Sequence, residues 1–222
     1  MATRLGMTRR LGIGIFVAMA TVLALSPPGP AAAGVGDSTA PPDDVIVVDV
    51  VTVNGSGCPA GTASVTVSPD NTGFRVTYRN YVARDGAGAD PVDFRKNCQL
   101  NLLVHIPQGF TYAIARADYR GFASLKAGAT ALQRAAYYFQ GSSDTAYSDH
   151  PFAGALRGDW HTVDETPVAA LVFAPCGRNV NLNVNTELRV DAGPSNGRSF
   201  IEMDSTNGRI NTIFQFHWKQ CH

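Results

Sequence analysis

The sequence has no excess of charge of either sign. It contains 18 Lys and Arg against 18 Asp and Glu, so its formal charge at pH 7 is zero. A nucleic-acid-binding surface needs an excess of basic side chains, and this balance argues against nucleic acid as a partner. Charged residues make up only 16% of the chain and hydrophobic residues 45%. That composition excludes a disordered chain and favours a globular protein.

Several motifs that carry known chemistry are also lacking. There is no P-loop, no H-E-x-x-H zinc motif and no pair of cysteines at C-x-x-C spacing. We therefore assign no catalytic residue and no cofactor from the sequence. The favoured interpretation is a non-catalytic protein that acts by surface recognition.

The first 33 residues are typical of an export signal. Arg4, Arg9 and Arg10 precede an uncharged stretch at 11–25, and small residues follow at 31–33. The apolar stretch is shorter than the roughly 20 residues of a membrane span. We expect cleavage after Ala33 by the general secretory route, with an uncleaved anchor or twin-arginine export as the alternatives.

The remaining chain is predicted to form one secreted domain. Removing residues 1–33 takes away three arginines and no acidic residue, which leaves 15 basic against 18 acidic side chains. Residues 34–44 are rich in Gly, Pro, Ala and Asp and form a flexible lead-in, and 45–222 form a single domain. No later stretch approaches membrane length, so we expect no stable membrane insertion after processing.

All four cysteines, Cys58, Cys98, Cys176 and Cys221, follow the predicted signal. An even number of cysteines in an exported chain predicts two disulfides. Three pairings are available. We favour Cys58 with Cys98 and Cys176 with Cys221, because these are the most local.

The chain reads as a series of short strands. Residues 45–53 are almost wholly β-branched, which favours a strand buried on both faces. Alternating apolar residues and turn signals predict one hairpin from 64–68 with 74–79 and another from 98–106 with 110–117. Residues 131–136 fit a short helix as well as a strand. The remaining expected strands are 119–125, 131–140, 168–173, 180–185, 200–203 and 210–218.

About ten strands without long helices favour an all-β fold. We expect an antiparallel two-sheet β-sandwich of the jelly-roll or immunoglobulin-like kind. Residues 141–166 interrupt the series and are predicted to be a long loop. Because long loops on rigid sandwiches often carry function, this segment is the first place to look for a site.

Two kinds of site are conceivable in that loop. Carboxylates and imidazoles that could bind a metal or act as acid and base are Asp149, His150, Asp159 and His161. Aromatic side chains that could stack on a sugar ring are Tyr147 and Trp160.

Outside this loop, an asparagine row at Asn181, Asn183 and Asn185 places amides on one strand face, where they could bind glycan hydroxyls or simply be solvated. The leading hypothesis is recognition of a cell-wall or carbohydrate ligand, and the alternative is a secreted hydrolase or metal-dependent enzyme that uses 141–166.

Two short motifs carry a family resemblance. Gly57-Cys58-Pro59 and Asn97-Cys98-Gln99 are similar to motifs of the secreted family known as domain of unknown function 4360. Similar stretches at 106–110, 118–123 and 137–141 extend the resemblance over the whole mature chain. The resemblance implies an exported, cysteine-containing, all-β protein, and it supplies no catalytic residue.

Overall fold

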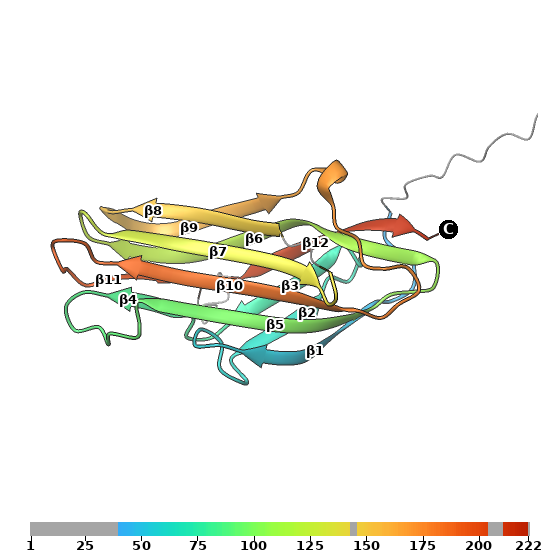
Figure 1. The fold of residues 1–222 in the computed structure, drawn as a ribbon, viewed down its shortest axis with the longest axis horizontal. Coiled ribbons are helices and arrows are strands. Elements are labelled where there is room, and N and C mark those ends of the chain that lie inside the picture. Colours follow the sequence, from blue (N-terminus) through green and yellow to red (C-terminus); the bar gives the residue numbers. More distant parts are fainter. Residues whose placement is uncertain (1–39, 143–145, 204–210, 222) are drawn as a thin grey trace, which may run out of the picture. The chain divides into compact units, whose positions relative to one another are not determined.

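The computed structural model describes residues 40–142, 146–203 and 211–221, which form a β-sandwich of two antiparallel sheets (Figure 1). The all-β prediction is confirmed. The predicted signal at 1–33 and most of the lead-in lie outside the described residues and stay predictions. In the described part, no helix is long and apolar enough to cross a membrane.

One sheet has five strands, and neighbours in it are far apart in sequence. In spatial order the strands are β1 (Val47–Asn54), β5 (Arg95–His105), β10 (Asn181–Asp191), β7 (Thr130–Phe139) and β8 (Ala146–Ala153). Strand β10 lies between β5 and β7 and pairs with β5 from Asn181 to Arg189 and with β7 from Leu182 to Asp191. Strand β10 is therefore the central strand of this sheet and contributes side chains to the middle of both of its faces.

The other sheet has seven strands and is organised by the long strand β6. Its order is β2 (Ala63–Val67), β3 (Gly73–Tyr78), β12 (Thr212–Gln220), β6 (Phe110–Leu125), β11 (Ser199–Glu202) and β4 (Val82–Asp85), and β9 (Leu156–Glu165) also pairs with β6. A single short 3-10 helix, η1 (Val168–Ala170), is described between β9 and β10. Strands β8 and β9 are consecutive but belong to different sheets.

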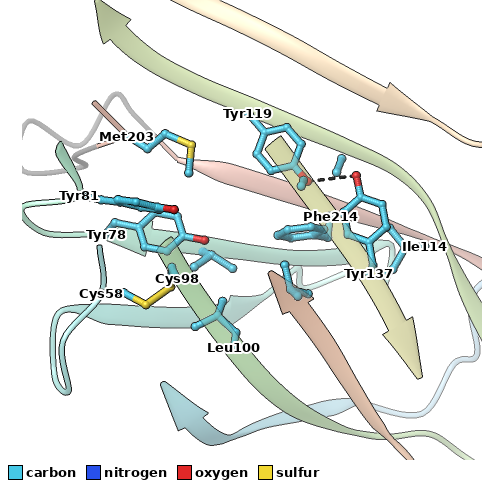
Figure 2. Packing of buried hydrophobic residues seen from close by; sticks show 14 of the residues in the cluster. Cys58, Tyr78, Tyr81, Cys98, Leu100, Ile114, Tyr119, Tyr137, Met203 and Phe214 are labelled. Carbon is cyan, nitrogen blue, oxygen red and sulfur yellow. Dashed lines mark hydrogen bonds between the residues drawn. A yellow bond between two sulfur atoms is a disulfide. The ribbon is translucent and has the colours of Figure 1, made fainter. Parts of the chain in front are cut away.

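The core lies between the sheets, where alternate side chains of each strand meet. On β5 the buried positions are Cys98, Leu100, Leu102 and Val104. From the opposite sheet, Phe74 and Phe214 stack with ring centroids 4.8 Å apart. Figure 2 shows Leu100 of β5 and Phe214 of β12 among the side chains that meet between the two sheets. The period-two pattern seen in the sequence therefore does mark the buried faces.

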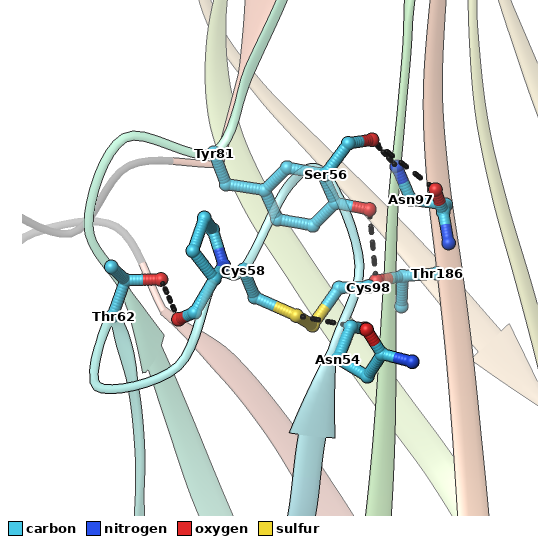
Figure 3. The surroundings of a disulfide bond; sticks show 9 residues. Asn54, Ser56, Cys58, Thr62, Tyr81, Asn97, Cys98 and Thr186 are labelled. Atoms are coloured by element: carbon cyan, nitrogen blue, oxygen red, sulfur yellow. Dashed lines mark hydrogen bonds between the residues drawn. A yellow bond between two sulfur atoms is a disulfide. The ribbon is translucent and has the colours of Figure 1, made fainter.

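The two disulfides have the favoured pairing. Cys58 is bonded to Cys98, and Cys176 to Cys221. The first bridge is buried in the core beside Tyr81 (Figure 3). A Cβ at Gly57 would meet the Tyr81 ring at 2.1 Å, so glycine is needed there for this close packing.

Three expectations about the strands differ from the structure. Strand β1 is at the edge of its sheet and is mostly exposed, with Val51 at 51%, because a β-branched run suits an edge strand as well as a buried one. The segments 98–106 and 110–117 do not form a hairpin, since β5 and β6 belong to different sheets and the turn between them crosses the sandwich. Residues 168–173 contain η1 and no strand.

The prediction of a long loop at 141–166 is also wrong. Its described part consists mainly of strands β8 and β9, which pair with β7 and β6. Both strands carry His and Asp in place of aliphatic residues, and β9 also carries Gly158, so the alternation of apolar and polar residues was hidden. Polar side chains are tolerated because β8 and β9 each pair on one side only with a described strand. The alternative at 131–136 is settled as strand, within β7.

Candidate functional site

The four candidate metal ligands are dispersed over two sheets. Asp149 accepts hydrogen bonds of 2.5 and 2.6 Å from Arg134 on the outer face of the five-stranded sheet. The Nε2 of His150 points between the sheets and lies 2.6 Å from Asp164 Oδ1. On β9, the Nε2 of His161 lies 2.9 Å from Asp118 Oδ1, and Asp159 is exposed. The described residues contain no group of three or more His, Cys, Asp or Glu placed to hold a metal.

The two candidate stacking residues differ in exposure, since Trp160 is buried and Tyr147 is exposed. Trp160 is only 7% exposed and packs on Phe152 with ring centroids 5.4 Å apart. Its ring belongs to the core, so the prediction of a sugar-stacking role is wrong for Trp160. Tyr147 is 73% exposed on β8. Its ring is therefore available to a ligand.

Strand register brings Tyr147 into line with the asparagine row. Asn185 on β10 lies opposite Gln99 of β5 on one side and Ala136 of β7 on the other. Ala136 in turn lies opposite Tyr147 of β8. Because residues in register share a face, these four side chains cross the outer face of the sheet in one row.

A depression of about 260 Å³ lies on this row. Its amide groups come from Asn97, Gln99 and Asn185, and Tyr147 borders it. Ala136 contributes only a methyl group between Asn185 and Tyr147, which leaves room there. The buried Oδ1 of Asn185 accepts no hydrogen bond from any described residue. Because this oxygen is buried, it lies beneath the surface of the hollow and not on it.

The side chains of Asn181 and Asn183, the other two asparagines predicted to share a face of this strand, form hydrogen bonds with Asn101 of β5. Asn101 Nδ2 donates to Asn183 Oδ1 at 2.8 Å, and Asn181 Nδ2 donates to Asn101 Oδ1 at 2.6 Å. These amides form a ladder between β5 and β10. Of the three asparagines on β10, only Asn185 therefore remains a candidate for binding a ligand, together with Asn97 and Gln99 on β5.

Charged side chains form the next row of the same face, along one border of the depression. Glu187 accepts hydrogen bonds from Arg95 Nε at 2.6 Å and from Arg189 Nη2 at 2.7 Å. Burial alone raises the pKa of Glu187, but the hydrogen bond from Arg95 and the charges of Arg189 and Arg95 outweigh it and hold the pKa below its usual value. The hydrogen bonds from Arg134 likewise lower the pKa of Asp149.

Beyond the charged row the same face has a second, more apolar depression of about 500 Å³. Leu132, Pro151 and Arg189 are among the residues that line it. The outer face of the five-stranded sheet therefore carries two hollows along β7, β8 and β10. We define this surface, from Gln99 and Tyr147 to Leu132 and Pro151, as the outer-face groove.

Sequence reasoning missed the charged and amide residues of the groove on β5 and β7. Arg95, Asn97 and Gln99 alternate with the buried residues of β5, so the period of two that identified the core also defines their shared face. Their proximity to Tyr147 depends on which strands pair, and local alternation carries no such information.

A serine-hydrolase interpretation finds no support in the fold. Residues 193–197 have the spacing G-x-S-x-G, but they form the turn between β10 and β11. The Oγ of Ser195 lies 3.4 Å from the carbonyl oxygen of Ala192. A nucleophile elbow joins a strand to a helix, and this turn leads into another strand.

Comparison with known proteins finds a relative that is a secreted protein. It is 35% identical over 186 residues to an uncharacterized secreted protein of Arthroderma benhamiae, covering 84% of this chain and 76% of that one. The enzymatically active domain of tailspike protein 4 of bacteriophage CBA120 matches with 11% identity and a TM-score of 0.25, over 77% of this chain and 19% of the tailspike chain. That likeness is too low to carry an argument.

The location and the family follow from these findings. The secreted relative and the two disulfides agree, and the protein is secreted. The family resemblance is confirmed for the chain from residue 44 to residue 221, over which the family model matches. The chain belongs to the family described as domain of unknown function DUF4360.

Proposed function

We propose that the protein binds a polysaccharide outside the cell through the outer-face groove. The observation that carries the proposal is the row Gln99–Asn185–Ala136–Tyr147, which joins planar amides to an exposed aromatic ring across a hollow. Amides donate to and accept from sugar hydroxyls, and a tyrosine ring covers the apolar face of a sugar. The row holds both kinds of group on rigid strands.

The openness of the groove favours a polymer over a small molecule. Enclosed cavities bury most of a small ligand, whereas these two hollows lie on the exposed face of a sheet. Ala136 and Leu132 are four residues apart on β7, which places the hollows about 13 Å apart along the strand. A chain of several sugar units spans that distance.

The two carboxylates beside the amide hollow, those of Asp149 and Glu187, favour binding over hydrolysis. A glycosidase needs one carboxylic acid whose pKa is raised so that it can donate a proton. In the groove, hydrogen bonds from Arg134 lower the pKa of Asp149, and the two arginines around Glu187 lower its pKa against the effect of burial. Neither carboxylate has the environment of a general acid.

The test is binding of the mature protein to a panel of soluble plant, fungal and bacterial polysaccharides by affinity electrophoresis and calorimetry. We expect at least one polysaccharide to bind, and Tyr147→Ala to weaken it about tenfold, equivalent to about 1.4 kcal/mol. The matched control is Phe122→Ala, which removes a half-exposed aromatic ring from the seven-stranded sheet. It should leave binding unchanged.

Two results would overturn the proposal. One is that no polysaccharide of the panel retards the wild-type protein. The other is that Tyr147→Ala binds as the wild type does while Phe122→Ala is impaired, which would place the site on the other sheet. Release of reducing sugar by the purified protein would favour the hydrolase alternative instead.

A further inference from the structure

Glu187 holds two arginine side chains in fixed positions at the border of the amide hollow. Its side chain is 8% exposed, and each of its carboxylate oxygens contacts a different guanidinium, Oε2 that of Arg95 and Oε1 that of Arg189. A buried carboxylate between two arginines restricts both guanidinium planes, because moving either one would leave the carboxylate less well paired. The positions of the arginines are therefore set before any ligand arrives.

The two arginines keep surface and donors for a ligand. The Arg95 and Arg189 side chains are 51% and 45% exposed. A guanidinium has five N–H donors, and Glu187 occupies only the edge that faces it. The exposed edges can receive a second carboxylate in the same fork geometry.

This cluster has one positive charge in excess. Two guanidinium groups share the single carboxylate of Glu187, whereas Arg134 and Asp149 form a one-to-one pair with two hydrogen bonds. Asp191 lies further along β10, beyond Arg189 and away from the amide hollow, and accepts a hydrogen bond from Gly193 N. The excess is local, since the chain as a whole has no net charge.

We infer, on the basis of the proposed function, that the groove selects an acidic polysaccharide and that a uronate carboxylate binds Arg95. Arg95 lines the amide hollow together with Gln99 and Asn185. A uronic acid presents hydroxyls, an apolar ring face and one carboxylate on a single sugar unit. These groups match the amides, Tyr147 and the single excess charge of the cluster.

The experiment compares polygalacturonate with the same polymer fully methyl-esterified, at matched length, by calorimetry in 50 and 300 mM salt. Esterification removes the charge and keeps the sugar. We expect the wild-type protein to bind the acid at least tenfold more tightly than the ester, with the difference shrinking at high salt. Dextran sulfate, added at the same concentration of negative charge, tests whether charge alone is sufficient for binding. We expect it to displace polygalacturonate only weakly.

Substitutions at Arg95 distinguish the effect of its positive charge from the effect of its forked guanidinium geometry. Arg95→Gln should bind the acid no more tightly than the ester, while Tyr147→Ala should weaken binding of both. Arg95→Lys keeps the charge without the fork and should show an intermediate preference. The matched control is Arg75→Gln, which removes an exposed arginine from β3 in the seven-stranded sheet and should change nothing.

The possible failures are distinguishable. Equal binding of acid and ester, or an unchanged preference in Arg95→Gln, would overturn the inference and leave the proposed function standing. Competition by dextran sulfate as strong as by polygalacturonate would show recognition of charge density only, and would also overturn it. No binding to either polymer or to any member of the wider panel would overturn both.

Discussion

Tyr137 connects the two sheets through polar groups inside the core. Its hydroxyl donates to Asp164 Oδ2 and accepts from Tyr119 at 3.1 Å, as the dashed line in Figure 2 shows for the two tyrosines. His150 Nε2 contacts the other oxygen of Asp164. Burial, followed by the charge of Asp164, raises the pKa of Tyr137. The hydroxyl therefore remains a donor, and the buried carboxylate depends on it.

Tyr137→Phe should destabilise the fold by about 1–3 kcal/mol, because it leaves a buried carboxylate oxygen without its donor. The measurement is the free energy of unfolding in urea. The neighbouring Tyr138→Phe is the matched control, since Tyr138 lies half-exposed on the opposite face of β7 and should change stability little. Equal effects of the two substitutions would show that the inter-sheet contact contributes nothing.

The two disulfides join elements in very different surroundings. Cys58–Cys98 ties the turn after β1 to β5 inside the core, with both residues at most 1% exposed. Cys176–Cys221 ties the segment before β10 to the end of β12, where Cys176 is exposed beside a hollow of about 680 Å³. The loops they close are similar, 40 and 45 residues, so each bridge contributes about 4 kcal/mol in the chain-entropy model.

Mild reduction under native conditions should therefore open Cys176–Cys221 first. A thiolate must reach the sulfur to attack it, and the core excludes reagent from Cys58–Cys98 until the protein unfolds. Alkylation after graded dithiothreitol treatment, followed by peptide mass spectrometry, measures the order. Loss of both bridges together, or of the buried one first, would contradict this prediction. In denaturant the two bridges should be reduced at similar rates, which provides the control.

Over the whole molecule, arginine–carboxylate pairs link stability to pH. The hydrogen bond from Arg116 lowers the pKa of Asp118, and the hydrogen bonds from Arg134 lower that of Asp149. Around Glu187 the arginines outweigh burial and lower the pKa as well. A carboxyl group whose pKa is lower in the folded state stabilises the fold above its unfolded pKa. That contribution disappears as the pH falls through the folded value.

The melting temperature should accordingly be nearly level from pH 7 to about pH 5 and fall below about pH 4.5, near the unfolded pKa of Glu and Asp. Glu187→Gln should lower the melting temperature at pH 7, and its difference from the wild type should shrink as the pH falls. Calorimetry of both proteins from pH 3 to pH 7 measures this. Asp159→Asn, which removes an exposed carboxylate of β9, should follow the wild-type curve. A Glu187→Gln difference that is constant with pH would contradict the linkage.

The sequence by itself determined the all-β class, the two disulfides with their favoured pairing, and the buried face of β5. These features depend on short-range alternation and on residues near each other in the chain. The family resemblance depended on local motifs in the same way. Where polar residues replaced aliphatic ones, as in β8 and β9, the alternation was hidden and a loop was predicted.

Only the tertiary structure decided which strands are neighbours, and so what lies on each outer face. Gln99, Asn185, Ala136 and Tyr147 come from four strands whose spatial order differs from their order in the chain. Trp160 lies on the same face of β9 as Asp164 and is buried against Phe152 of β8, a contact between strands of different sheets that the local pattern does not specify. Strand pairing is set by the packing of the whole core, and local pattern specifies only the two faces of each strand.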